Sequence, residues 1–147
     1  MKVYLDTCCL NRPWDDQSQP RIHFETEAIL LILAKLDRHE WEWIGSEILF
    51  YEIRLTTDDE RREYTLLLAS QSHSVIELTP KILEHAESLE NAGFDAYDAI
   101  HLASADAAQA DIFLTTDDQM VKRANRNKKL FSLRVENPVK WLEEVLK

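Results

Sequence analysis

Short apolar segments with strand character alternate with longer helical segments along this chain, and no other feature constrains its fold as strongly. Strands are predicted at residues 2–5, 41–44, 75–78, 111–115 and 131–135. Helices are predicted at residues 21–38, 47 to about 57, 58 to about 70, 80–93, 95–110, from 117 onward, and 138–147. The helix at 58–70 either continues the preceding one or starts anew. Strands alternating with helices predict a parallel sheet covered on both faces. We therefore predict a three-layer α/β/α fold with a central parallel sheet of four to five strands.

Several residues mark the ends of these elements. Ser46 can cap the helix that follows the second strand. Pro80 and Pro138 stand at first helical positions, where proline is tolerated. The segment between the first strand and residue 20 is polar and contains Pro13, so we predict a loop there and a first helix delayed until residue 20 or 21.

The length and composition are those of an ordinary globular domain. The chain has 147 residues, of which 45% are apolar and 30% are charged, and we predict a single domain over residues 1–147. No stretch reaches the ~18 uninterrupted apolar residues of a membrane span. The N-terminus has no apolar signal-peptide core. We expect a cytoplasmic protein that does not associate with membranes.

Cys8 and Cys9 are adjacent and are the only cysteines. Adjacent thiols make neither a disulfide framework nor a zinc site, which needs spaced ligands and usually four of them. We predict two buried, reduced thiols with a structural role. A vicinal disulfide or a reactive thiol is the alternative.

The formal net charge is −10, from 27 acidic and 17 basic residues. Nucleic-acid-binding proteins usually carry a basic surface, so this balance argues against nucleic-acid binding. The bases are unevenly distributed, and five of them fall in one short run: Lys122, Arg123, Arg126, Lys128 and Lys129. We interpret the run as a solvated helix end, where cations suit the helix dipole, slightly in preference to a binding patch.

Two aspartates stand at the carboxyl ends of predicted strands. Asp6 ends the first strand and Asp117 lies just past the fourth. Parallel α/β sheets bind their ligands at this rim, so both side chains are candidates for a functional site. The alternatives are structural, because Asp117 or Asp118 can cap the next helix and Asp6 can open a turn.

Glu52 interrupts the apolar face of its predicted helix. Its neighbours three and four residues away include Ile48, Leu49 and Leu55, so its carboxylate falls on the side that should face the core. A buried carboxylate is strongly destabilising unless it is paired or bound to a metal. Glu47, by contrast, falls on the outer face near Arg54 and is predicted to be solvated.

Asp98 lies on the same helical face as Leu102 and Ala105. Its alternative role is in the first helical turn, after a cap at Asp95, where the helix dipole favours an acid. His101 is close enough in sequence to lie beside Asp98. We predict a partly exposed, structural or supporting histidine rather than a metal ligand.

Carboxylates that converge on one rim raise one another's pKa values unless cations neutralise them. Oxygen ligands without spaced cysteines or a histidine pair suit Mg²⁺ or Mn²⁺ rather than zinc. Neither a P-loop nor a dinucleotide-binding glycine motif occurs in the sequence. Metal-assisted hydrolysis of a phosphodiester is therefore the predicted class of reaction.

Four stretches of the chain resemble the PIN-domain family, in particular the VapC-type toxins of bacterial toxin–antitoxin pairs. They are YLDT at residues 4–7, SEILFYE at 46–52, AYDAIHLASA at 96–105 and FLTTDD at 113–118. The stretches occur in the family's order and at plausible separations, and the resemblance covers essentially the whole chain.

This resemblance implies a three-layer α/β/α fold, a Mg²⁺ or Mn²⁺ site, cleavage of single-stranded RNA, a homodimer and inhibition by an antitoxin protein. By position it implies that four acids bind metal and activate water: Asp6, Glu52, Asp98 and Asp117. Thr115 or Thr116 would orient a carboxylate, and Asp118 is an adjacent candidate. The segment after Asp6 departs from the family's usual pattern. Its Arg12 is a candidate phosphate contact.

Two other functions compete with a ribonuclease: a phosphatase or phosphotransferase, and a non-catalytic binding module. Haloacid-dehalogenase-like phosphatases need an Asp-x-Asp motif after the first strand, but Thr7 and Cys8 follow Asp6. A receiver domain needs an aspartate at the end of its third strand, where Leu78 and Thr79 stand. A non-catalytic module that keeps the fold for partner binding agrees with the net charge of −10, but the retained set of four acids argues against it.

Overall fold

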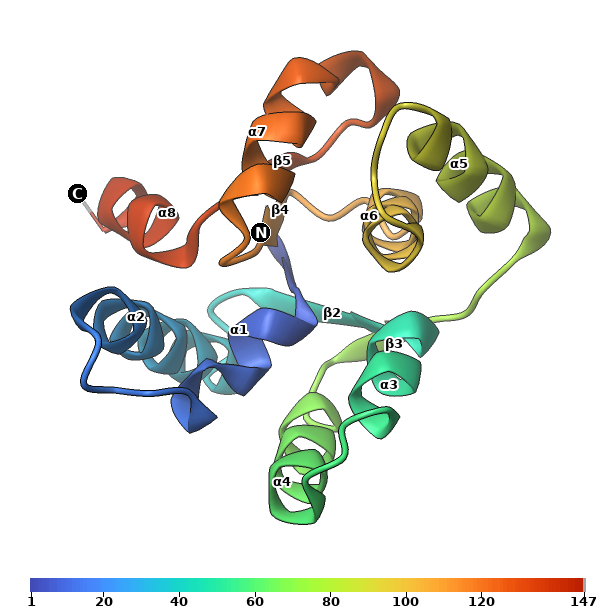
Figure 1. Cartoon of the computed structure of the whole chain (residues 1–147). Coiled ribbons are helices and arrows are strands. Elements are labelled where there is room, and N and C mark those ends of the chain that lie inside the picture. Colours follow the sequence, from blue (N-terminus) through green and yellow to red (C-terminus); the bar gives the residue numbers. More distant parts are fainter. Residues whose placement is uncertain (147) are drawn as a thin grey trace.

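The computed structural model describes residues 1–146, and at its centre is a sheet of five parallel strands in the order β3-β2-β1-β4-β5 (Figure 1). The strands are β1 (Lys2–Leu5), β2 (Glu42–Ser46), β3 (Ser74–Ile76), β4 (Ile112–Leu114) and β5 (Arg134–Glu136). In the central register Tyr4 lies opposite Ile44 on one side and Phe113 on the other. The predicted parallel sheet of four to five strands is confirmed.

Eight α-helices join the strands: α1 (Thr7–Asn11), α2 (Pro20–Asp37), α3 (Glu47–Arg54), α4 (Asp59–Ala69), α5 (Pro80–Asn91), α6 (Ala96–Ala107), α7 (Asp118–Arg126) and α8 (Pro138–Val145). Two short 3₁₀ segments, η1 (Arg12–Trp14) and η2 (Lys128–Leu130), complete the described elements. The predicted end of the last helix at Lys147 lies outside the described residues.

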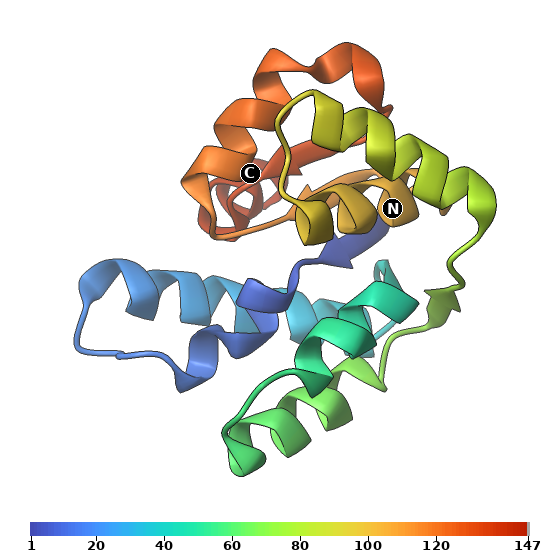
Figure 2. The ribbon, with the colours of Figure 1, turned by 45° about the vertical axis from the view of Figure 1, so that its right-hand side comes forward.

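Alternate strand residues face two separate hydrophobic layers, because side chains in a strand alternate between the faces of the sheet. Tyr4 and Phe113 belong to the layer that includes residues of α5, α6 and α7. Val3, Leu5 and Leu114 belong to the layer that includes residues of α1–α4 and α8. Figure 2 shows the sheet between these two sets of helices. The predicted three-layer α/β/α fold is confirmed.

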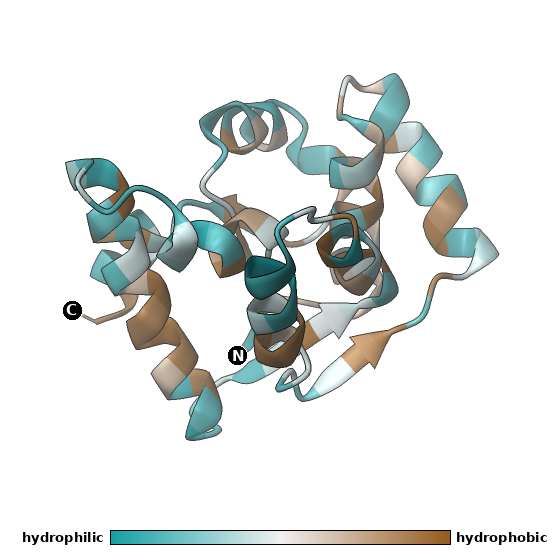
Figure 3. Cartoon of the chain, turned by 60° about the horizontal axis from the view of Figure 1, so that its bottom comes forward, coloured by the Kyte–Doolittle hydropathy of each residue, from teal (hydrophilic) through white to brown (hydrophobic). Residues whose placement is uncertain are grey.

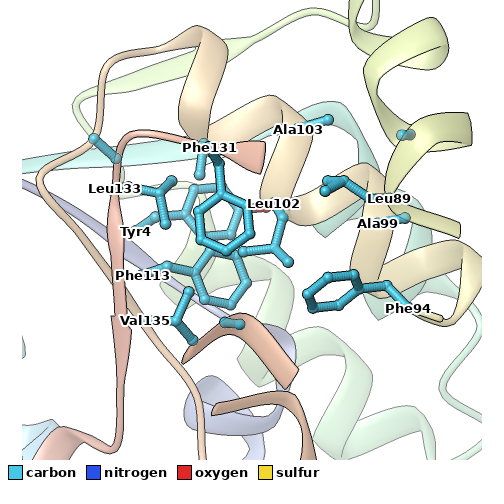
Figure 4. Packing of buried hydrophobic residues seen from close by; sticks show 14 of the residues in the cluster. Tyr4, Leu89, Phe94, Ala99, Leu102, Ala103, Phe113, Phe131, Leu133 and Val135 are labelled. Carbon is cyan, nitrogen blue, oxygen red and sulfur yellow. The ribbon is translucent and has the colours of Figure 1, made fainter. Parts of the chain in front are cut away.

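The α5–α7 layer is rich in aromatic side chains. The rings of Tyr4 and Phe113 stack with centroids 5.0 Å apart, and Leu102, Phe131 and Val135 surround them (Figure 4). The helices carry hydrophilic and hydrophobic residues side by side (Figure 3), as expected where one face of a helix covers a sheet. Among residues 1–146, no helix is long and apolar enough to cross a membrane.

The prediction of a loop until residue 20 is wrong, because α1 begins directly after Asp6. The Asp6 side chain accepts a hydrogen bond from the backbone N–H of Thr7 and so caps this short helix. Cys9 and Leu10 are fully buried in the hydrophobic layer that includes residues of α1–α4 and α8. Burial against the core, rather than local helix propensity, thus stabilises a helix of five residues.

The second strand runs through Gly45 to Ser46, two residues further than predicted. Gly45 pairs with Val75 of β3, and a Cβ at this position would lie 2.7 Å from the Oγ of Ser72. Glycine here therefore allows a close approach of two segments rather than ending the strand.

Candidate metal centre

The parallel sheet brings all four predicted acids to one rim. Asp6 follows β1, Asp117 follows β4, and Glu52 lies in α3, which directly follows β2. These three strands are neighbours, and parallel strands present their carboxyl ends on the same edge. The acids line a hollow of about 370 Å³, hereafter the acidic hollow, whose lining is Asp6, Thr7, Cys8, Asn11, Asp15, Glu52, Arg61, Asp98 and Asp117.

Asp6 is buried and held through both carboxylate oxygens. Its Oδ1 accepts from the N–H of Thr7 at 2.8 Å, and its Oδ2 accepts from the hydroxyl of Thr115 at 2.9 Å. Burial raises the pKa of Asp6, although the charge of His101 and the Thr115 hydrogen bond act in the opposite direction. The side chain is thus fixed in orientation and poorly solvated, which suits a resident ligand to a cation.

Glu52 lies in the hollow with a side chain 27% exposed. Its Oε1 accepts hydrogen bonds from the Nε2 of His101 at 3.0 Å and from the hydroxyl of Thr7. Burial acts to raise the pKa of Glu52, but His101 and Thr7 outweigh it and the pKa is lowered. The carboxylate that interrupts the apolar face of α3 is therefore a paired anion, as its place in the sequence indicated.

His101 is almost fully buried, so the prediction of a partly exposed histidine is wrong. Its Nδ1 lies 2.6 Å from the hydroxyl of Tyr4, and that hydroxyl lies 2.6 Å from the Oγ of Ser46. Burial acts to lower the pKa of His101, but the hydrogen bond and charge of Glu52 and the charge of Asp6 raise it overall. A buried chain of polar side chains therefore runs from Glu52 into the core, and every member has a partner.

Ligand atoms of Asp6, Glu52 and His101 lie within 4.8 Å of one another. The Nε2 of His101 is 4.0 Å from Asp6 and already contacts Glu52. The hydrogen bond between Tyr4 and Nδ1 is compatible with either tautomer, so His101 is placed to support the carboxylates or to bind an ion itself.

Asp98, in the first turn of α6, has a strongly perturbed carboxyl group. Burial, and then the negative charge of Asp6, raise its pKa to about 7, while His101 acts against them. Such a shift is the expected result of placing a partly buried carboxylate beside other acids without a cation. Groups with strongly shifted pKa values are concentrated at functional sites.

Asp117 and Asp118 are neighbours in sequence but have different surroundings. The Oδ1 of Asp117 caps α7 by accepting from the N–H groups of Gln119 and Met120, which leaves Oδ2 for a ligand in the hollow. Asp118 is exposed and forms an ion pair with Arg21 at 2.6 Å. It is not among the residues that line the acidic hollow.

The remaining candidates divide in the same way. Thr115 donates to Asp6 and accepts from the N–H of Asp117 at 3.2 Å, so it bridges two of the acids. Thr116 contacts its surroundings through its backbone, donating to the Sγ of Cys8 and accepting from Arg21. Arg12 is paired with Asp15 and Glu25 and lies outside the lining of the hollow.

Both cysteines are free thiols, as predicted. Cys9 is fully buried and its Sγ contacts the carbonyl of Leu114. Cys8 is less buried than predicted and lines the hollow, where its Sγ lies 3.5 Å from Asp6 and 3.4 Å from the hydroxyl of Thr115.

The sequence did not mark five residues of the lining as part of a site: Thr7, Cys8, Asn11, Asp15 and Arg61. The last three are furthest from the predicted acids in sequence or in element. Arg61 donates to the side chain of Asn11 at 2.7 Å and to Asp15 at 2.6 Å. Among the described residues of the lining it is the one cation. No periodicity marks these residues, because Asn11 and Asp15 come from the segment predicted as a loop and Arg61 reaches them from α4.

The sequence matches the PIN domain family over residues 3–126. The chain belongs to the PIN domain family. A search of curated protein sequences finds no significant match.

Two solved structures share the fold of this PIN domain. The crystal structure of VapBC2 from Rickettsia felis, bound to a DNA fragment from their promoter, matches with a TM-score of 0.60 and 17% identity over 93% of this chain and 98% of the other. The structure of VapBC-1 from nontypeable Haemophilus influenzae matches with a TM-score of 0.58 and 14% identity over 94% of this chain and 98% of the other.

The donor set of this PIN domain fits a hard divalent cation. The acidic hollow presents carboxylate oxygens from four elements, and burial together with the charge of Asp6 raises the pKa of Asp98. A cation bound among these oxygens would remove the repulsion between these acids. The single neighbouring thiol, Cys8, does not make a zinc site, which uses several cysteine or histidine ligands.

Proposed function

We propose that this protein is a Mg²⁺- or Mn²⁺-dependent endoribonuclease that hydrolyses phosphodiester bonds in single-stranded RNA. The observation that carries the proposal is the convergence of Asp6, Glu52, Asp98 and Asp117 in one hollow at the carboxyl rim of the sheet. Membership of the PIN domain family supports it.

Asp6, Glu52, Asp98 and Asp117 would hold the metal. When bound, the ion supplies a water of lowered pKa and positive charge at the phosphate in the transition state. Thr115 and the N–H of Thr7 fix Asp6, while His101 and the hydroxyl of Thr7 fix Glu52. These supporting contacts hold the carboxylates in place before substrate arrives, and such support is worth about 10- to 100-fold in metal affinity or activity.

The biological role we propose is that of the toxin of a toxin–antitoxin module in the cytoplasm. The two similar structures are both of VapBC proteins, and the four stretches of sequence that resemble VapC-type toxins contain Asp6, Glu52, Asp98 and Asp117. The module would supply an antitoxin protein as partner, and the toxin would form a homodimer.

A non-catalytic PIN-fold module that binds a partner is the second candidate, and the net charge of −10 favours it. Expression of the wild type and of Asp98→Asn in a bacterial host separates the two. An enzyme should arrest growth in an Asp98-dependent way. Growth arrest by both proteins alike, or by neither, would favour the binding module.

Metal binding itself is tested by thermal unfolding of the purified protein with and without Mn²⁺ or Mg²⁺. A ligand at 100 times its Kd adds about 2.7 kcal/mol to the free energy of unfolding, so the melting temperature should rise. Asp6→Asn should remove most of this rise. If neither ion changes the melting temperature of the wild type, the metal centre is ruled out.

A further inference from the structure

Two pairs of exposed aromatic rings stand next to, or one helical turn from, residues that line the acidic hollow. Tyr51 of α3 and Tyr97 of α6 meet edge to face with centroids 6.1 Å apart. Trp14 of η1 and Tyr64 of α4 meet in the same way at 5.5 Å. All four side chains are between 39% and 51% exposed, although aromatic rings of this size are usually more deeply buried.

Each pair is adjacent to residues that line the hollow. Tyr51 precedes Glu52 and Tyr97 precedes Asp98 in the sequence. On the other pair, Trp14 precedes Asp15, and Tyr64 lies about one helical turn beyond Arg61. The two aromatic pairs therefore lie on elements that carry residues of the hollow or on segments next to them, one pair on α3 and α6 and the other on η1 and α4.

The charge around the hollow is poor for binding a polyanion. Among the described residues of its lining, five are acids and Arg61 is the one cation. The basic run of the chain does not supply positive charge at the hollow. Helix α7 begins at the acidic rim with its cap Asp117 and leads to η2 and the start of β5, which lie at the opposite rim of the sheet. Arg126, Lys128 and Lys129 lie at that far end.

An RNA that reaches this site thus needs a source of affinity other than its phosphates. Stacking of an unpaired base on an aromatic side chain contributes about 1–3 kcal/mol and does not depend on base identity. Tyrosine and tryptophan are suited to it because they offer a rigid apolar face at a wet surface.

We propose that the Tyr51–Tyr97 and Trp14–Tyr64 pairs are stacking platforms for unpaired bases on the two sides of the phosphate that enters the acidic hollow. The inference rests on the proposed ribonuclease function and adds to it the manner of substrate binding. It explains how an acidic protein can select single-stranded RNA, since bases in a duplex are not available for stacking on the protein.

The test is binding of a short fluorescent single-stranded RNA, measured by anisotropy in Mn²⁺, with Asp117→Asn in every protein to block cleavage. Tyr51→Leu, Tyr97→Leu, Trp14→Leu and Tyr64→Leu should each weaken binding about 5- to 100-fold. Tyr97→Phe and Tyr64→Phe should bind like the parent, because they keep the ring. Phe24→Leu is the matched control, since Phe24 is 62% exposed on α2 and neither of its sequence neighbours lines the hollow.

An abasic RNA of the same length gives the second readout. The Leu variants and the parent should bind it equally weakly, because the bases that stack are absent. Equal binding of normal RNA by the parent and all four Leu variants would overturn the inference. It is also overturned if affinity falls only in variants whose mass by light scattering drops from dimer to monomer, because the rings would then form a protein interface.

Failure of this inference is distinguishable from failure of the proposed function. If the protein with Asp117 intact cleaves RNA in Mn²⁺ while the Leu variants bind RNA as the parent does, the stacking platforms are wrong and the ribonuclease stands. If it cleaves no RNA in Mn²⁺, the proposed function itself is wrong.

Discussion

The four acids proposed to bind metal differ in what holds each carboxylate. Asp6 and Glu52 have hydrogen-bond partners from other elements, and Asp117 uses one oxygen as a helix cap. The pKa of Asp98 is instead raised to about 7, first by burial and then by the charge of Asp6. A cation bound in the hollow should therefore act strongly on Asp98.

Asp98→Asn should stabilise the metal-free protein at high pH. Because the pKa of Asp98 is raised from 3.8 to about 7 on folding, its favourable contribution is complete below pH 3.8 and is lost as the pH rises through 7. A pKa shift of this size corresponds to about 4 kcal/mol in the free energy of unfolding. We expect a difference of about 1–2 kcal/mol between the variant and the wild type, because the side chain is partly exposed and screened.

Urea unfolding in EDTA measures this difference. The variant should be the more stable protein at about pH 8, and the difference should shrink as the pH falls toward 4. Saturating Mn²⁺ should reverse the order, since the variant loses a ligand. A variant that is less stable than the wild type at every pH in EDTA would contradict the assigned repulsion.

Asp117→Asn and Asp118→Asn form a matched pair of neighbouring substitutions. Asp117 lines the hollow, whereas Asp118 is 55% exposed and pairs with Arg21. Loss of Asp117 should reduce RNA cleavage by about 10²-fold or more, as removal of one electrostatic group from an active site does. Asp118→Asn should keep near-normal cleavage and cost less than about 1 kcal/mol, the usual value of an exposed ion pair. Equal loss of cleavage in both variants would refute the assignment.

At the scale of elements, the alternation of strands and helices was sufficient to predict the layers and the parallel sheet. It could not predict α1, because that helix is too short for a periodic signal and depends on the burial of Cys9 and Leu10. The predicted second strand stopped at residue 44, before Gly45. The close approach that requires glycine there involves Ser72, which is distant in sequence.

The site was predictable only where an acid follows a strand of a parallel sheet or lies on the apolar face of a helix. Asp6 and Asp117 follow strands, and Glu52 interrupts an apolar helical face, so each gave a local signal. The burial of His101 depends on Tyr4 and Ser46, which join it from β1 and the end of β2. Arg61 enters the hollow from α4. Contacts of this kind leave no trace in periodicity or spacing.

A buried carboxylate, Glu25, is the centre of a polar network that links η1, α2, α7 and α8. Its side chain is 2% exposed and is paired with Arg12 of η1 at 2.8 Å and with Arg21 of α2 at 3.3 Å. It also accepts from the side chain of Asn137, the cap of α8, at 2.6 Å. Arg21 in turn contacts Thr116 and Asp118 at the start of α7. The network fixes the loop that carries Asp117.

Glu25→Ala should destabilise the protein by about 3–5 kcal/mol, because it leaves two guanidinium groups without their buried partner. Chemical denaturation measures the loss. Glu27→Ala on the same helix is the control, since Glu27 is 64% exposed and its removal should change stability by no more than about 0.5 kcal/mol. Equal effects of the two substitutions would show that the network does not stabilise the fold.

At the scale of the whole molecule, the two kinds of charge are separated by the sheet. The acids gather at its carboxyl rim, and the basic run gathers at the end of α7 and in η2. This separation agrees with the interpretation of the basic run as a helix end.

Cleavage of an end-labelled single-stranded RNA by the purified protein shows whether the acidic hollow is a metal-dependent ribonuclease site. Wild type, Asp6→Asn and Asp118→Asn are compared in Mn²⁺ and in EDTA. We predict internal cleavage by the wild type and Asp118→Asn in Mn²⁺ only, with a loss of about 10²-fold or more in Asp6→Asn. RNA left intact by the wild type in Mn²⁺, or equal cleavage by Asp6→Asn, would contradict the account.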